Sequence, residues 1–458
     1  MAAFNEDVLV PNRGLRSSLL RILQEAIAAV DPYKAVKKQF VLNGEALQVG
    51  EQSYSLAAFE RIYVLGTGKA GMSMARAIDD TLGARITQGI VIVKDAGDAD
   101  SLPAAVGRIQ LLPASHPVPD QRGVDGAKAI EQVARQARAN DLVVALISGG
   151  GSALLADVAE PISLIELQSM TSLLLACGAT INEINCLRKH CSSLKGGQLA
   201  RAAHPATLIT LVLSDVVGSP LDVIGSGPTV ADPSSWQDAW AVVEKYGLAD
   251  RLPATIRQRL QDGLAGKLAD TPKADDSVFT TTQTLIIADN RIAALAAKAE
   301  AERIGYHTLL LSTFVEGEAA EVAKVACALA KEVKVSHLPI APPACFILGG
   351  ETTVNLGSGE IGKGGRNQEL ALASALRIAG EEGITIVSLA TDGSDGPTDS
   401  AGAIVDGGTI ARGEALGLAA KLYLRRHNAY PFLQRTNDLL VCGPTHTNVN
   451  DLIFVFVE

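Results

Sequence analysis

Residues 61–71 read RIYVLGTGKAG, an apolar stretch that runs directly into a glycine-rich turn. The last six of these residues match the pattern G-x-G-x-x-G, which in an α/β protein surrounds the phosphates of a bound dinucleotide with backbone N–H groups. The stretch therefore predicts a buried strand, a tight turn and a helix. Lys69 lies within the turn, although a pyrophosphate there needs only backbone donors, so the bound group is expected to require a counter-charge.

Similar apolar segments alternate with helical ones along most of the chain. Uninterrupted apolar strands between helices are typical of a parallel sheet that is covered on both faces. The sequence therefore predicts an α/β protein made of three-layer α/β/α domains with mainly parallel sheets. The predicted strands are 61–66, 88–95, 108–115, 141–147, 208–216, 284–290, 305–313, 345–355, 384–393 and 451–458.

The length of 458 residues exceeds what one hydrophobic core normally serves, so two domains are expected. We place an N-terminal domain at 1–240, a polar helical connector at 241–275 and a C-terminal domain at 276–458. One or two helices within 14–40 precede the first strand. The terminal segment 451–458 is apolar almost throughout and is expected near the middle of the second sheet.

The composition excludes several classes of protein. A formal net charge of −10 argues against a nucleic-acid surface, which needs a basic face. No apolar run approaches the ~18–20 residues of a membrane span, and the first residues lack the layout of a signal peptide. The six cysteines form no C-x-x-C pair and read as free thiols. We expect a cytoplasmic protein that binds neither nucleic acid nor membrane.

Four glycine-rich loops stand where strands should give way to helices, at 66–71, 148–152, 195–197 and 362–366. A tight turn explains a single loop as well as a ligand does, but four loops, two with an internal Lys or Arg, favour several phosphate or carboxylate groups. The loop residues predicted to bind ligand are Gly66, Gly68, Gly71, Ser148, Gly149, Gly150, Gly151, Ser152 and Lys195.

Strand-end acids and one polar helix stripe are further candidates. Asp215, Glu351 and Asp392 each follow an apolar strand, where a carboxylate can hold Mg²⁺ beside a phosphate or simply cap a turn. The residues of the polar stripe share one helix face, which either lines a ligand or is solvated. It consists of Asn185, Arg188, Ser192 and Lys195.

Three classes of function are compatible with these patterns: a kinase, an NAD(P)H-dependent reductase and a ligand-binding protein without catalysis. A dehydrogenase needs an acid at the end of the second strand, but Asp95 comes late and follows Lys94. His116 is interpreted as a hydrogen-bonding loop residue. A kinase of neither the P-loop nor the protein-kinase lineage accounts for Lys69, because phosphoryl transfer requires cationic stabilisation.

The order of motifs along nearly the whole chain resembles the class II glycerate kinase family, also called the MOFRL family. The motifs are VLGTGKAG, SHPVPD, LISGGGSALL, INEINCLRKHCSSLKGGQLA, SDVVGSPLDVIGSGPT, ILGGETTV, GKGGRNQELAL, ATDGSDGPTDSAGA and GPTHTNVNDL. The resemblance implies an ATP- and Mg²⁺-dependent glycerate 2-kinase that converts D-glycerate into 2-phosphoglycerate. It also implies a Rossmann-like N-terminal domain, a C-terminal MOFRL domain and an active site in the cleft between them.

The resemblance assigns roles to individual residues. It implies that Lys69 and Arg366 are catalytic, that Asp215 binds metal and that Glu351 lies in the site. Ser219 stands where many members have an aspartate, so either the metal shell is in doubt or Asp222 takes over that role. Some members are labelled hydroxypyruvate reductase, a name tied to tartrate degradation, so an NAD(P)H-dependent hydroxypyruvate reductase is the alternative function. The expected partners are D-glycerate and ATP, with a homodimer as a further expectation.

Overall fold

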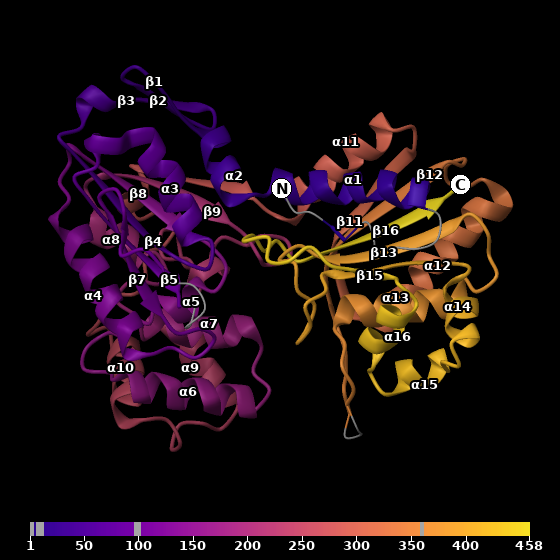
Figure 1. Cartoon of the computed structure of the whole chain (residues 1–458). Helices are drawn as coiled ribbons and strands as arrows, with labels where there is room; N and C mark the ends of the chain where they lie inside the picture. Colours follow the sequence, from indigo (N-terminus) through magenta and orange to yellow (C-terminus); the bar gives the residue numbers. More distant parts are fainter. Residues whose placement is uncertain (1–3, 6–12, 96–101, 358–360) are drawn as a thin grey trace. The chain divides into compact units, whose positions relative to one another are not determined.

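The computed structural model describes residues 4–5, 13–95, 102–357 and 361–458. It divides into two compact units, which we call the central unit, Pro32–Ile287, and the C-terminal unit, Met1–Asp31 together with Ala288–Glu458 (Figure 1). No helix within the described ranges combines the length and the apolar character that crossing a membrane requires.

The central unit is built on a seven-stranded sheet that confirms the predicted α/β class. Its order is β10 (Thr282–Ala288), β9 (Thr207–Leu213), β8 (Asp141–Ile147), β4 (Arg61–Thr67), β5 (Gln88–Lys94), β7 (Ile109–Ala114) and β6 (Ala105–Val106). The strands from β9 to β7 pair in parallel, and β6 runs antiparallel to β7. All seven residues of β8 are buried, as an uninterrupted apolar strand requires.

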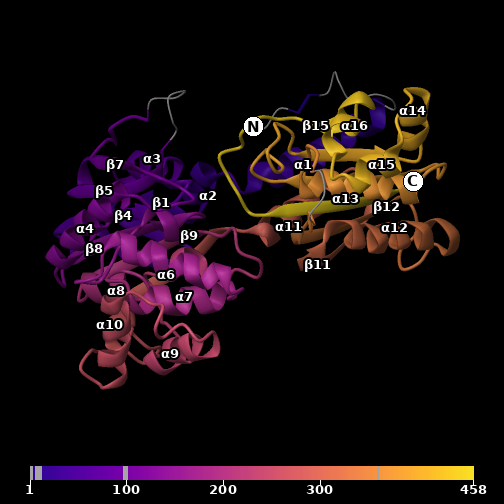
Figure 2. The ribbon, with the colours of Figure 1, turned by 90° about the horizontal axis from the view of Figure 1, so that it is seen from below.

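Helices of the central unit form two apolar clusters. α4 (Gln121–Gln136) and α8 (Gln198–Ala203) cover strand residues such as Leu65 and Val143. A second cluster joins α6 (Leu164–Ala176), α7 (Ile181–His190), α9 (Trp236–Lys245) and α10 (Ala254–Leu264), which lie together in both views (Figures 1 and 2). The remaining elements are α3 (Gly71–Leu82), α5 (Gly151–Leu154) and a small antiparallel sheet of β1 (Phe40–Asn43), β2 (Ala46–Val49) and β3 (Gln52–Ser55).

The C-terminal unit contains a six-stranded sheet. Its order is β11 (His307–Glu318), β12 (Ala344–Thr353), β16 (Asp451–Val457), β13 (Ile384–Ala390), β14 (Gly402–Asp406) and β15 (Leu439–Leu440). β16 lies between β12 and β13 with every residue buried, as predicted. The strand directions differ from the mainly parallel sheet expected here, because only β11 and β12 run parallel and the other neighbours run antiparallel. An apolar strand that is buried on both faces has the same sequence pattern whether it runs parallel or antiparallel to its neighbours.

Helices cover both faces of this sheet (Figure 1). α12 (Ala319–Ser336) and α13 (Arg366–Arg377) pack on Phe346, Ile386 and Val455. α11 (Asn290–Arg303) packs on β12 and β16 and is in turn covered by α1 (Arg13–Ala29). The shorter helices are α14 (Thr409–Ala415), α15 (Ala420–Arg425) and α16 (Ala429–Arg435).

The two units do not coincide with the predicted domains. The predicted connector 241–275 contains α10, whose Ile256 and Leu260 are part of the second apolar cluster of the central unit. β10 was expected to open the second domain, but it extends the central sheet beside β9. α1 belongs to the C-terminal unit because its partner is α11. The local pattern of a helix or strand does not reveal which core it joins.

Candidate active site

The turn after β4 packs directly on the loop after β8. The backbone N–H of Lys69 donates to the carbonyl of Gly149 at 2.9 Å, and that of Ala70 donates to Ser148 Oγ at 3.1 Å. Gly68 has φ +131°, and a Cβ there would lie 2.1 Å from Ser148 Oγ. Because β4 and β8 are parallel neighbours, their carboxyl ends meet at one edge, and the two predicted glycine loops form one surface.

Two glycines of the first motif serve packing. A Cβ at Gly66 would lie 2.7 Å from the carbonyl oxygen of Leu146, and one at Gly71 would lie 2.8 Å from Val91 Cγ1. These glycines let neighbouring strands and α3 approach closely. Of the three glycines in G-x-G-x-x-G, Gly68 is therefore the one that holds the turn against the neighbouring loop.

Three side chains gather around the second loop. Gly150 has φ +78°, and a Cβ there would lie 2.9 Å from the His116 ring and 3.2 Å from Lys69 Cε. A Cβ at Gly149 would lie 2.0 Å from Asp215 Oδ2. The Lys69 side chain is exposed, and no described residue forms a hydrogen bond or ion pair with its ammonium group. The loop is thus flanked by one carboxylate and by one cation that has no partner among the described residues.

A second lysine contributes to the charge of this edge. Burial, together with the smaller effects of the nearby charges of Lys69 and Lys94, lowers the pKa of His116 to about 4. Lys94 ends β5, the parallel neighbour of β4, and is exposed. Two ammonium groups around a neutral imidazole favour anions. The position of Lys94 at a strand end could have indicated this role, but the sequence analysis considered Lys94 only as the residue that precedes Asp95.

Ser152 and Asn185 are linked through a residue that sequence reasoning missed. Ser226 Oγ lies 2.8 Å from Ser152 Oγ and 3.3 Å from Asn185 Oδ1. Ser226 is fully buried with φ +61°, between two glycines that also have positive φ. The loop after β9 therefore ties α7 to the helix that follows the second glycine loop. Asn185 lies near the predicted loop, and its oxygen already accepts a hydrogen bond.

Lys195 was predicted to bind ligand, but in the structure its side chain is paired inside the protein. Its buried ammonium contacts Asp157 and the carbonyl of Leu155. Asp157 also accepts hydrogen bonds from the backbone N–H groups of Ser193 and Leu194, both at 2.8 Å. This cation is neutralised inside the protein and stabilises the loop between α7 and α8.

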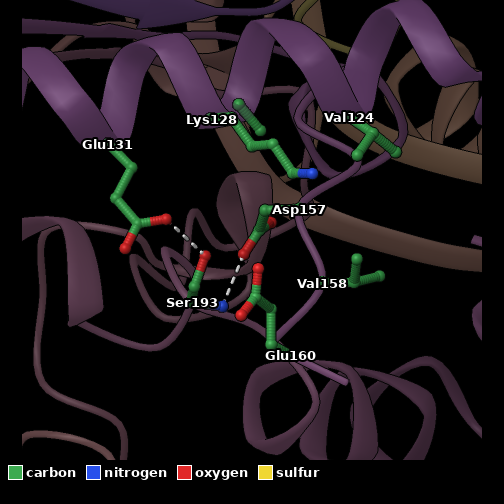
Figure 3. Close-up of a pocket in the computed structure, with 8 residues that line it drawn as sticks. Val124, Lys128, Glu131, Asp157, Val158, Glu160 and Ser193 are labelled. Atoms are coloured by element: carbon green, nitrogen blue, oxygen red, sulfur yellow. Dashed lines mark hydrogen bonds between the residues drawn. The ribbon is translucent and has the colours of Figure 1, made fainter. Parts of the chain in front are cut away.

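Asp157 also lines a cavity of about 440 Å³ beneath α4 (Figure 3). Lys128 extends from α4 above Asp157 and Glu160, and Ser193 donates to Glu131 at 3.0 Å. None of the predicted site residues lines this cavity. We therefore do not include it in the candidate active site.

A second group of predicted residues lies in the C-terminal unit. Arg366, the first residue of α13, donates from Nη1 to Glu351 at 2.6 Å and from Nε to Asp451 at 2.5 Å. Asn450 donates to the other oxygen of Glu351 at 3.0 Å. Burial raises the pKa of Asp451 to about 7, against the opposing effect of Arg366. Asp451 begins β16 beside β12, and the sequence analysis treated its segment as a strand and as the end of the last family motif without singling out Asp451.

Glu351 and Arg366 line a cavity of about 490 Å³, and Asp392 is another of its lining residues. Asp395 at its wall accepts hydrogen bonds from the backbone N–H groups of Asn367 and Gln368, at 3.1 and 2.8 Å, and so caps α13. The titratable lining residues are Glu351, Arg366, Glu369, Asp392, Asp395 and His427. The predicted site residues thus fall into two clusters, one in each unit.

The residues that the structure describes offer few ligands for a metal ion. Within the described ranges, no three His, Cys, Asp or Glu side chains are placed to hold one. Mg²⁺ in phosphate-transfer enzymes uses one or two carboxylates together with substrate phosphates, so Asp215 beside the glycine loops fits such a shared site. Its neighbour Ser219 supplies no carboxylate.

An α/β unit whose glycine loops lie beside an exposed lysine has the features of a protein that binds anions, and two family models match the chain. A model described as a domain of unknown function (DUF4147) matches residues 18–261, and the MOFRL family model matches 344–451. The chain belongs to the MOFRL family of class II glycerate kinases, as its motifs predicted.

Individual relatives match over nearly their full length. The glycerate 2-kinase of Pyrococcus horikoshii is 39% identical, with 97% of each chain covered. A protein of Agrobacterium vitis named putative hydroxypyruvate reductase is also 39% identical, over 96% of this chain and 94% of its own. The crystal structure of glycerate kinase from Thermotoga maritima aligns with a TM-score of 0.86 at 36% identity, over 97% of this chain and all of its own.

Proposed function

We propose that the protein is a glycerate 2-kinase, which transfers the γ-phosphoryl group of ATP to D-glycerate and forms 2-phospho-D-glycerate. The observation that carries this proposal is the ammonium of Lys69, which has no partner among the described residues and lies beside the glycine loop at Gly150. The names of the P. horikoshii and T. maritima relatives support the same activity.

The chemistry follows from the distribution of charge. Phosphoryl transfer places negative charge on non-bridging oxygens, and its catalysis consists mostly of positioning and cationic stabilisation. Lys69 and Lys94 supply cations at the edge where the parallel strands end, and the glycine loops supply backbone donors. Mg²⁺, when bound, neutralises phosphate charge, and Asp215 would hold it together with phosphate oxygens.

Arg366 is proposed as the second catalytic group. Its guanidinium is oriented by Glu351 and Asp451, which hold it in one geometry at the start of α13. The location of the active site in a cleft between domains stays a prediction, as does a homodimer. A cytoplasmic location is supported by six free cysteines, because reduced thiols persist in reducing compartments.

The hydroxypyruvate reductase alternative rests on the names of the A. vitis relatives. An NAD(P)H enzyme of this fold uses a strand-end acid for the ribose hydroxyls. Asp95 holds that position, but Arg122 Nη1 lies 2.6 Å from its Oδ2. The free lysine and the engaged acid together favour the kinase.

A paired assay on the purified protein tests the proposal. One reaction contains D-glycerate, ATP and Mg²⁺, with ADP release followed, and the other contains hydroxypyruvate with NADH or NADPH. Enolase, which accepts only the 2-phosphate, then identifies the position of the phosphoryl group. We expect ADP release that depends on D-glycerate and a product that enolase consumes directly. Oxidation of NAD(P)H without ADP release would establish the reductase instead.

A further inference from the structure

Arg188 of α7 is a partly buried arginine without a partner among the described residues. No described residue forms a hydrogen bond, an ion pair or a ring contact with its guanidinium. Other partly buried arginines within the described ranges have hydrogen-bond or ion-pair partners. Arg366 contacts Glu351 and Asp451, Arg412 contacts Asp406 and Asp438, and Arg259 donates to the His190 carbonyl and lies over the Trp236 ring.

Burial lowers the pKa of Arg188, and no neighbouring acid opposes this effect. Withdrawing a charge from water without a counter-charge costs free energy, which a bound anion can offset. A charged group that is perturbed in this way and lies beside a ligand loop is a candidate binding residue. The partial burial also excludes the solvated face that the sequence left open as an alternative.

The position of Arg188 connects it with the glycine loops. Asn185 lies one helical turn earlier, so the two side chains share a face of α7. Through Ser226, Asn185 is linked to Ser152 at the start of α5. α7 and α5 both pack on the short helix Ile224–Ser226. The face that carries Arg188 therefore adjoins the loop 148–152.

Neighbouring lysines are already neutralised. Lys189 lies 3.1 Å from Asp222 and 3.2 Å from Asp232, and Lys195 is paired with Asp157. Arg188 is thus the remaining cation of the polar stripe. Its fork of parallel N–H groups matches the two oxygens of a carboxylate, whereas a lysine acts as a point charge.

We propose that Arg188 forms a carboxylate-binding subsite, which takes the carboxylate of D-glycerate. The identity of the ligand rests on the proposed function. Phosphate would also fit a guanidinium, but Lys69 and Lys94 already supply cations for phosphates around Gly150. The assignment separates the two anions of the reaction: phosphates beside β4 and β5, and the substrate carboxylate beside α7.

The test compares Arg188→Gln and Arg188→Lys with the control Arg251→Gln, which removes an exposed arginine without a partner among the described residues. We expect Arg188→Gln to raise the KM for D-glycerate about tenfold to a hundredfold, since a charged hydrogen-bond pair is lost. The Kd of ATP, measured by calorimetry, should stay within about twofold. Arg188→Lys should restore little of the affinity, and Arg251→Gln should change neither constant.

Thermal melting separates binding from a structural role. Removing an unpaired charge should not lower the Tm of Arg188→Gln, whereas a lower Tm with both ligands weakened would overturn the proposal. An unchanged KM for D-glycerate would also overturn it, and a raised Kd for ATP alone would assign the subsite to phosphate instead. If the unaltered protein releases no ADP, the proposed function fails. Calorimetric titration of D-glycerate into the unaltered protein and into Arg188→Gln then still shows whether Arg188 binds the carboxylate.

Discussion

The cations of the central unit differ in whether a carboxylate already neutralises them. Lys189 and Lys195 are buried in ion pairs, and their charges stabilise the loops around α7. Lys69 is exposed and unpaired at the glycine turn, within the part of the chain that the structure describes. A paired lysine holds the fold, whereas an unpaired one beside bare backbone is available to a ligand.

Lys69→Ala should lower kcat about a hundredfold or more, because it removes a cation aimed at developing negative charge. The Tm should not change, since the side chain is exposed and has no partner among the described residues. Lys128→Ala is the matched control, because Lys128 is another exposed lysine of the same unit and likewise has no partner among the described residues. A Lys69→Ala protein that keeps most of its kcat would remove Lys69 from the catalytic groups.

His116 reports on the same cluster. In Lys69→Met its pKa should rise from about 4 but stay below 6.5, because burial is the larger cause of the shift. The unfolded chain binds more protons than the folded one between these values, so stability is lost as the pH falls from about 6.5 towards about 4. NMR titration of the imidazole measures the pKa in both proteins. An unchanged value would show that Lys69 does not act on His116.

At the scale of elements, the carboxyl ends of β4 and β8 determine where the loops meet. These strands are parallel neighbours, so their following turns pack on each other, and positions 68 and 149 have no room for a side chain. The loop after β9 joins them through Ser226. Three loops far apart in sequence therefore form one surface because their strands share one sheet edge.

Gly68→Ala tests this packing against Gly83→Ala. Both glycines have positive φ, but a Cβ at Gly83 meets nothing within 4 Å, whereas one at Gly68 meets Ser148 Oγ at 2.1 Å. Gly83→Ala should lower the free energy of unfolding by about 1 kcal/mol through backbone strain alone. Gly68→Ala should cost more and should also lower kcat/KM. Urea unfolding and steady-state kinetics measure both effects, and equal costs would contradict the close approach.

At the scale of the whole molecule, each unit has its own core. β10 belongs to the central sheet, and the N–H of Leu208 donates to the carbonyl of Thr281 at 2.9 Å beside it. α10 completes the cluster around Trp236. α1 covers α11 in the C-terminal unit, although nearly 260 residues separate the two helices in sequence.

A fragment of residues 32–287 should therefore fold cooperatively, whereas the fragment 1–240 should not. The shorter fragment lacks β10 and α10, which exposes the apolar edge of β9 and part of the second cluster. Circular dichroism during urea unfolding distinguishes a cooperative transition from a gradual one. A cooperative transition in 1–240 alone would favour the boundaries that the sequence suggested.

The positions of most strands could be predicted from the sequence because an uninterrupted apolar run is a local signal. The same is true of the glycine loops, and motif resemblance identified Lys69 and Arg366 as candidates. Sheet membership and direction could not be read in this way. β10 and the strands of the C-terminal sheet have the apolar pattern of any buried strand, whichever neighbour they pair with.

The sequence by itself determined the α/β class, the family and the positions of the glycine-rich loops, because each depends on residues close together along the chain. Only the tertiary structure decided which charges remain available. Lys195 and Arg188 belong to one polar stripe, yet Lys195 meets Asp157 and Arg188 meets no acid among the described residues. Whether a cation is neutralised depends on groups that are distant in sequence, and folding alone brings them into contact.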